Sequence, residues 1–254
     1  AMGLPDLWIK TVKEKKDEDW EIGKMWGDMC LRRPGENTVS YVESHDQALV
    51  GDQTMIFRLA GANMYTDMEK STHNPVIDRA IALHKIIRLF TMAGGGEGYL
   101  NFMGNEFGHP EWIDFPREGN DWSYKYARRQ WSLADADFLR YKSLQNFDAT
   151  MIRYFKKENI LRGSLRQLYV DEERKVLIFS RGNSIFAFNF NPSVSHENFS
   201  FWAPEGKYEM AFNSDQTEFD GFNRLGENEC HETFDGRLSL YLPSRVVIVL
   251  KKTQ

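Results

Sequence analysis

The apolar residues of this chain change their spacing near residue 160, and this change limits the possible folds more than any other feature. Up to about residue 157, short apolar runs alternate with longer segments of helical periodicity, an order typical of parallel α/β structure. From about residue 163, short apolar runs are separated by turn residues, which is typical of an antiparallel β-sandwich. We therefore predict an α/β region at residues 1–160 and an all-β domain at residues 161–254.

In the α/β region, one long helix has recognisable signals at both ends. Asn74 is predicted to cap it, Pro75 fits its first turn, and the glycines at residues 94–96 end it. Its apolar residues recur at spacings of three and four, which predicts one buried face. They are Val76, Ala80, Leu83, Ile87 and Phe90. Further helices are predicted at residues 5–15 and 136–157, and short strands at residues 39–43 and 99–103.

The all-β domain is predicted from short apolar runs and one strong turn signal. Asp235-Gly236 favours a tight hairpin between two of the runs. Strands are predicted at residues 176–180, 185–190, 207–212, 232–234, 237–242 and 245–250.

Composition excludes several classes of function. The formal net charge is −5 and the basic residues form no block, so nucleic-acid binding is not expected. Cys30 and Cys230 are too few for a disulfide framework or a zinc site, and they favour a reducing compartment such as the cytoplasm. No apolar stretch is long enough to cross a membrane. We predict neither a metal ion nor a cofactor.

Polar residues follow both predicted strands of the α/β region. Glu43, His45 and Asp46 end the first strand, and Glu106 follows the second. Because the carboxyl ends of parallel strands meet at one edge, these residues predict a site there. A strand followed by an ordinary polar turn explains the first group equally well. Ser44 and His45 are adjacent and point to opposite faces of a strand, so they form no catalytic triad.

Aromatic residues are concentrated after the second strand. Trp112 and Trp122 lie there among Asn, Asp and Arg residues, a mixture that suits a polyhydroxyl ligand such as a sugar. Packing of a long loop explains the same residues. His84 falls within the long predicted helix and is interpreted as a core or surface histidine. The glycines at residues 94–96 follow a helix and are interpreted as its end, not as a phosphate-binding loop.

Four sequence blocks closely resemble the glycogen and starch branching enzymes of the α-amylase superfamily, in its eukaryote-like branch. They are MGLPDLW at residues 2–8, YVESHDQ at residues 41–47, GYLNFMGNEFGHPEW at residues 98–112 and NDWSYKYARRQW at residues 120–131. The His-Asp strand end alone is shared by the whole superfamily, whereas the longer blocks are specific to branching enzymes. The similarity extends over the whole chain.

This resemblance implies the carboxyl-terminal part of a (β/α)8 barrel followed by an antiparallel β-sandwich. It implies a hexosyltransferase that moves an α-1,4-glucan segment to a 6-hydroxyl and retains the anomeric configuration. Asp46 then corresponds to the carboxylate that stabilises the transition state. The residues predicted to bind the substrate are His45, Glu43, Gln47, Glu106, Trp112 and Trp122.

The resemblance also predicts what this chain lacks. In the family, the nucleophilic Asp and the acid/base Glu lie on earlier barrel strands, which should precede Met2. The chain begins Ala1-Met2, so we expect either an expression remnant or a start inside a longer protein. We therefore expect the chain alone to be inactive and to need the missing part of the barrel.

The predicted partner is an α-glucan, which means glycogen, amylose or amylopectin, in the cytoplasm or in a plant plastid. Two other functions are compatible with the sequence. One is a non-catalytic glucan-binding module, and the other is a superfamily hydrolase or debranching enzyme.

Overall fold

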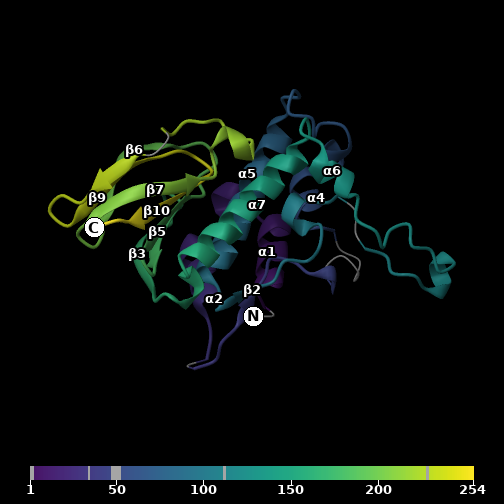
Figure 1. Cartoon of the computed structure of the whole chain (residues 1–254), viewed down its shortest axis with the longest axis horizontal. Helices are drawn as coiled ribbons and strands as arrows, with labels where there is room; N and C mark the ends of the chain where they lie inside the picture. Colours follow the sequence, from purple (N-terminus) through teal and green to yellow (C-terminus); the bar gives the residue numbers. More distant parts are fainter. Residues whose placement is uncertain (1–2, 34, 47–52, 111–112, 227–228) are drawn as a thin grey trace.

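The computed structural model describes residues 3–33, 35–46, 53–110, 113–226 and 229–254. Helices dominate the first part of the chain and antiparallel strands the second, and the two parts pack side by side (Figure 1). The helices are α1 (Gly3–Glu14), α2 (Ile22–Cys30), α4 (Met55–Ala60), α5 (Pro75–Gly94), α6 (Trp131–Asp135) and α7 (Arg140–Lys157). Short 3-10 turns are η1 (Asp17–Asp19), η2 (Gly61–Tyr65), η3 (Asn105–Phe107), η4 (Glu118–Asn120), η5 (Ile160–Arg162) and η6 (Thr217–Phe219). No helix among the described residues is both long enough and apolar enough to cross a membrane.

Two short parallel strands, β1 (Val39–Ser40) and β2 (Gly98–Tyr99), form a sheet of their own. Helices α4 and α5 lie between them in the chain and α7 follows, so the strand–helix–strand–helix order is present. Both strands are shorter than the sequence predicted, because the ladder stops after two residue pairs. Gly96 is required beside β1, since a Cβ there would lie 2.0 Å from the carbonyl oxygen of Thr38.

Helix α5 is the central element of the helical part. Its predicted cap is confirmed, because the Asn74 Oδ1 accepts a hydrogen bond from the Val76 N–H at 2.9 Å, and the helix ends at Gly94 as expected. The prediction of a single buried face was wrong. Every residue from Leu83 to Gly94 is buried, because α2, α4, α7 and the large sheet all pack against this helix.

Helix α7 begins four residues later than predicted. The backbone of residues 138–140 pairs with residues 68–70 instead: the Lys70 N–H donates to the Phe138 carbonyl and the Arg140 N–H donates to the Met68 carbonyl, both at 2.9 Å. This pairing holds the segment extended until Arg140.

The all-β domain is a sandwich of two antiparallel sheets. The larger sheet has the order β3-β4-β5-β10-β7-β8 and the smaller pairs β6 with β9. The strands are β3 (Leu165–Asp171), β4 (Val176–Arg181), β5 (Ser184–Asn189), β6 (His196–Trp202), β7 (Lys207–Asn213), β8 (Cys230–Glu232), β9 (Arg237–Leu242) and β10 (Val246–Lys252). The antiparallel prediction is confirmed, and β3 and β6 are strands that the sequence analysis missed.

The predicted hairpin at Asp235-Gly236 is partly right. Both residues have positive φ, 50° and 69°, and Phe234 and Arg237 bridge across the turn, as in a type I′ hairpin. The flanking strands nevertheless belong to different sheets, because β8 pairs with β7 whereas β9 pairs with β6.

The central strands of the larger sheet, β4, β5 and β10, are buried on both faces. Because side chains alternate along a strand, Ile178 and Ala187 face the smaller sheet, while Phe179 and Phe188 face the helices. The aromatic face packs on Trp26, whose ring lies 4.7 Å from that of Phe179. Each face therefore belongs to a separate apolar core. The core on the aromatic face is shared between the sandwich and the helices.

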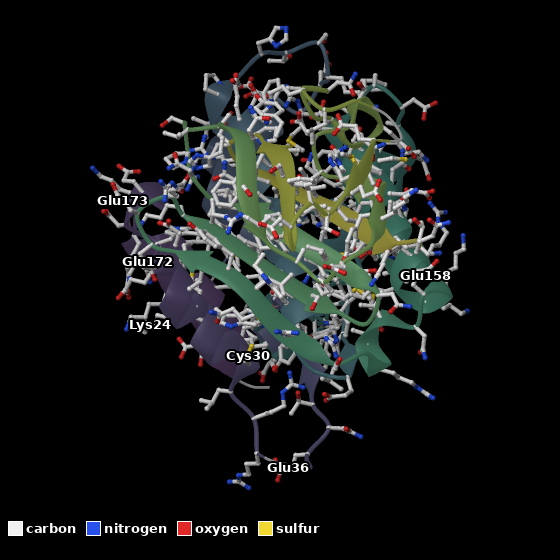
Figure 2. The ribbon with its side chains drawn as sticks, turned by 90° about the vertical axis from the view of Figure 1, so that its left-hand side faces the viewer. Lys24, Cys30, Glu36, Glu158, Glu172 and Glu173 are labelled. Atoms are coloured by element: carbon white, nitrogen blue, oxygen red, sulfur yellow. The ribbon has the colours of Figure 1, made fainter. Side chains whose placement is uncertain are left out.

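Polar contacts join the sandwich to the ends of the helices. Glu172, in the turn after β3, accepts hydrogen bonds from the first N–H groups of α2, including that of Ile22 at 2.8 Å. Arg181 donates to the carbonyls of Ala93 and Gly96 at the end of α5, at 3.0 and 2.9 Å. Glu158, after α7, pairs with Lys251 at 2.9 Å, and Figure 2 shows it across the sheet from Glu172. The contacts of Glu172 and Arg181 satisfy backbone groups at helix ends that would otherwise lack partners, whereas the Glu158–Lys251 pair joins two side chains.

Candidate functional site

The candidate site lies where β1 and β2 end side by side. The Leu100 N–H donates to the Ser40 carbonyl at 3.0 Å, which extends the pairing one step beyond the strands. Residues 41–46, the first exit, and residues 100–107, the second exit, therefore leave the sheet at the same edge. This arrangement confirms that the two predicted strands are parallel neighbours.

His45 and Asp46 are the exposed groups of the first exit. Their side chains are 44% and 66% exposed, and the imidazole Nε2 lies 3.1 Å from the carboxylate Oδ1. The His45 ring also contacts Phe102 of the second exit, with centroids 5.5 Å apart, and Phe115 at 6.2 Å. The imidazole is thus placed between the exits, and a solvent-accessible carboxylate stands next to it. Such a pair can bind hydroxyl groups or stabilise a developing positive charge.

Glu43 belongs to the same exit as His45 and Asp46 but is buried. Its residue is only 5% exposed, and its Oε2 accepts a hydrogen bond from the Met55 N–H at 2.7 Å. Burial raises the pKa of this carboxyl to about 7, although the Met55 N–H and the positive charge of Arg88 act in the opposite direction. In this chain Glu43 lies beneath the surface on which His45 and Asp46 stand.

The second exit contributes Glu106, which is partly buried in η3. Its Oε2 accepts a hydrogen bond from the Gly104 N–H at 2.7 Å, and burial raises the pKa of its carboxyl.

Trp122 is 66% exposed in a segment that projects away from the body at the right of Figure 1. Gln47 and Trp112 lie outside the described residues. The binding roles of all these residues, and the role of Asp46, remain predictions.

A buried polar cluster behind the exits was not predicted. Arg88 of α5 donates to Asp148 of α7 at 2.6 Å and to the Asn101 Oδ1 at 2.7 Å, and Asn101 donates to the other Asp148 oxygen at 2.9 Å. This closed triangle joins the second exit to both helices. The only sequence signal was a charged residue inside the apolar repeat of a helix, one position after Ile87.

His84 lies one turn before Arg88 and is 1% exposed, so of the two positions considered for it, core and surface, the structure shows the core. Burial, followed by the charge of Arg88, lowers the pKa of this imidazole well below its usual value. Among the residues that the structure describes, no group of three or more His, Cys, Asp or Glu side chains could hold a metal ion.

Known proteins match both parts of the chain. The family model of the alpha amylase C-terminal all-beta domain matches residues 169–253. The 1,4-alpha-glucan-branching enzyme of Saccharomyces cerevisiae is 49% identical over 98% of this chain. This chain is homologous to the 1,4-alpha-glucan-branching enzymes. The resemblance seen in its motifs is thereby confirmed.

Other branching enzymes match to the same degree. Those of Equus caballus and Solanum tuberosum are each 49% identical, over 99% and 92% of this chain. The chain spans 37% of the yeast and horse branching enzymes and 27% of the potato enzyme. The match therefore covers only part of each of these enzymes. Among solved structures, a debranching enzyme of Nostoc punctiforme overlaps 85% of this chain and 34% of its own, with a TM-score of 0.48 at 16% identity, which is too low to bear on function.

Proposed function

We propose that this chain forms the last quarter of the catalytic barrel and the terminal sandwich of a glucan branching enzyme. Strands β1 and β2 then correspond to the last two strands of a (β/α)8 barrel, and α5 and α7 to the helices that follow them. The proposed domains are residues 1–160 and 161–254. The parallel pairing of β1 with β2 and the intervening helices support this assignment.

The proposed reaction is a retaining transfer of an α-1,4-glucan segment to a 6-hydroxyl, which creates an α-1,6 branch. A nucleophilic carboxylate and an acid/base carboxyl about 5 Å apart are needed for such a transfer. We assign both to a part of the parent protein outside this chain. Asp46 stabilises the oxocarbenium-like transition state, and His45 binds a neighbouring sugar hydroxyl. Gln47, Glu106, Trp112 and Trp122 are proposed to contact the glucan.

The observation that carries this proposal is that about half of the residues are identical to those of branching enzymes over nearly the whole chain. The exposed Asp46 at the exit of a parallel strand supports it. A strand exit of this kind is where barrel enzymes hold their catalytic groups. We further propose that the reaction takes place in the cytoplasm, or in a plastid if the source is a plant, because the two cysteines favour a reducing compartment.

The test is Asp46→Asn in the parent protein. We expect branching to fall by roughly 10²–10³-fold, because an electrostatic interaction with the transition state is lost. Because Asp46 is 66% exposed, the melting temperature should hardly change. New α-1,6 linkages are counted after debranching of the product, and Asp137→Asn, at another exposed aspartate, is the control. Near-normal branching by the Asp46 variant would contradict the assignment.

The isolated chain provides a second test, because it should neither cleave nor branch amylose in an iodine-stain assay. Activity of the pure chain would show that the other carboxylates are not needed from outside it.

A glucan-binding module without catalysis remains the second candidate, favoured by the exposed Trp122. In that case glycogen in a gel slows the migration of the parent protein, but the protein forms no new α-1,6 linkage. A hydrolase would instead release reducing ends without new branches.

A further inference from the structure

Glu43 joins the first strand exit to the beginning of helix α4. It precedes His45 by two residues, and its carboxylate accepts the hydrogen bond of the Met55 N–H, twelve residues further along the chain. Both residues are buried, at 5% and 2% exposure. A single side-chain hydrogen bond thus connects the backbone before the exposed His45 and Asp46 pair to the backbone after it.

The surroundings of Glu43 hold it in place without exposing it. Arg58 of α4 and Arg88 of α5 provide the positive charges that act on its carboxylate. Arg88 is itself fixed by Asp148 and Asn101, which belong to α7 and the second exit. The Glu43 carboxyl therefore lies within electrostatic reach of the polar cluster that joins the second exit to α5 and α7.

We infer that Glu43 is a positioning residue for His45 and Asp46 and does not contact the glucan. The inference rests on the proposed function and replaces the role of sugar ligand that the sequence suggested for this residue. A buried acceptor bonded to the Met55 N–H fixes the backbone two residues before the imidazole. Since an error of about 1 Å in the placement of a catalytic group can cost roughly a hundredfold in rate, such a contact affects catalysis without touching substrate.

Two variants of similar size separate the possible roles. Glu43→Gln keeps an oxygen that can accept the Met55 N–H, whereas Glu43→Met has a comparable length but no acceptor. In the full-length parent protein, we expect Glu43→Met to lower kcat by roughly 10–100-fold with KM within about twofold of the unmodified value. Glu43→Gln should restore kcat to within about threefold.

Each other result contradicts the inference. A rise in KM in both variants identifies Glu43 as a sugar ligand. A lower melting temperature with unchanged kcat per folded molecule identifies a purely structural role. An equal loss of kcat in both variants shows that the charge, and not the hydrogen bond, is required. If the unmodified parent forms no α-1,6 linkage, the proposed function fails, whereas an active parent with an unimpaired Glu43→Met variant refutes the positioning role alone.

Discussion

Helix α5 takes part in two regions of opposite character. On one side it packs on the large sheet, where the rings of Phe90, Phe179 and Phe188 are fully buried and lie 5.4–6.3 Å apart. We call this region the junction. On the other side lie the strand exits, where the side chains of His45 and Asp46 are exposed to solvent. The junction is a closed core within this chain, whereas the exits present chemical groups on a surface.

Helix α5 connects these two regions through charged side chains that point to different partners. Lys85 reaches the sandwich, where its Nζ donates to the carbonyls of Ser214 and Phe219 at 2.6 and 2.7 Å. Arg88, three residues later, reaches Asn101 of the second exit at 2.7 Å. The helix that contacts the second exit is therefore also hydrogen-bonded to the sandwich. This arrangement suggests that the all-β domain supports the geometry of the site without contributing a residue to it.

The largest effect is expected from an aromatic residue of the junction. Phe179→Ala should lower the free energy of unfolding by about 3–5 kcal/mol, because it leaves a cavity among fully buried rings. Phe234, on the same domain but 87% exposed, is the matched control, and its alanine variant should change stability by less than about 0.5 kcal/mol. Urea unfolding of the 254-residue chain measures both. Similar losses in the two variants would mean that the junction is not the main core.

A smaller effect, dependent on pH, is expected from Lys85 in the junction. Burial lowers the pKa of its ammonium from 10.5 to about 8, although Asp220 and Asp215 oppose the shift, and Arg140 and Arg224 add to it. Between pH 8 and 10.5 the unfolded chain therefore holds a proton that the folded chain has released. Stability should rise with pH across this window, by on the order of 3 kcal/mol.

The measurement compares unfolding of the unmodified chain and Lys85→Met from pH 7.5 to 10.5. We expect the stability difference between the two proteins to shift in favour of the unmodified chain as pH rises. A constant difference would show that Lys85 titrates normally and that the junction does not exclude water from it.

Local signals in the sequence predicted some of these features well. Asn74 and Gly94 mark the ends of α5 because caps depend on residues within one turn. Strand β3 was missed because all of its residues are exposed or only partly buried, so its apolar pattern is weak. The burial of every residue from Leu83 to Gly94 was missed because it depends on a sheet whose first strand begins only at Leu165.

The site shows the same limit. His45 and Asp46 could be singled out because an apolar run stops at them. The burial of Glu43 could not be inferred, because it depends on Met55 and on the folding of the intervening chain. Arg88 and Asp148 are 60 residues apart, so no local pattern indicates that they pair. Local spacing thus indicates which residues are exposed at an exit, whereas the contacts that support them come from the assembled fold.

The smallest effect on stability is expected from Trp122, in the segment that projects beside the exits. Its side chain is 66% exposed, so Trp122→Ala should change the free energy of unfolding by less than about 0.5 kcal/mol. If the proposed glucan contact is correct, retardation of the chain in a glycogen gel should nevertheless weaken. Trp202 of the sandwich is 51% exposed and provides a matched control on the other region. If retardation weakens equally in the two variants, any exposed tryptophan binds glucan here. That result would contradict the proposal that the exits form the binding surface.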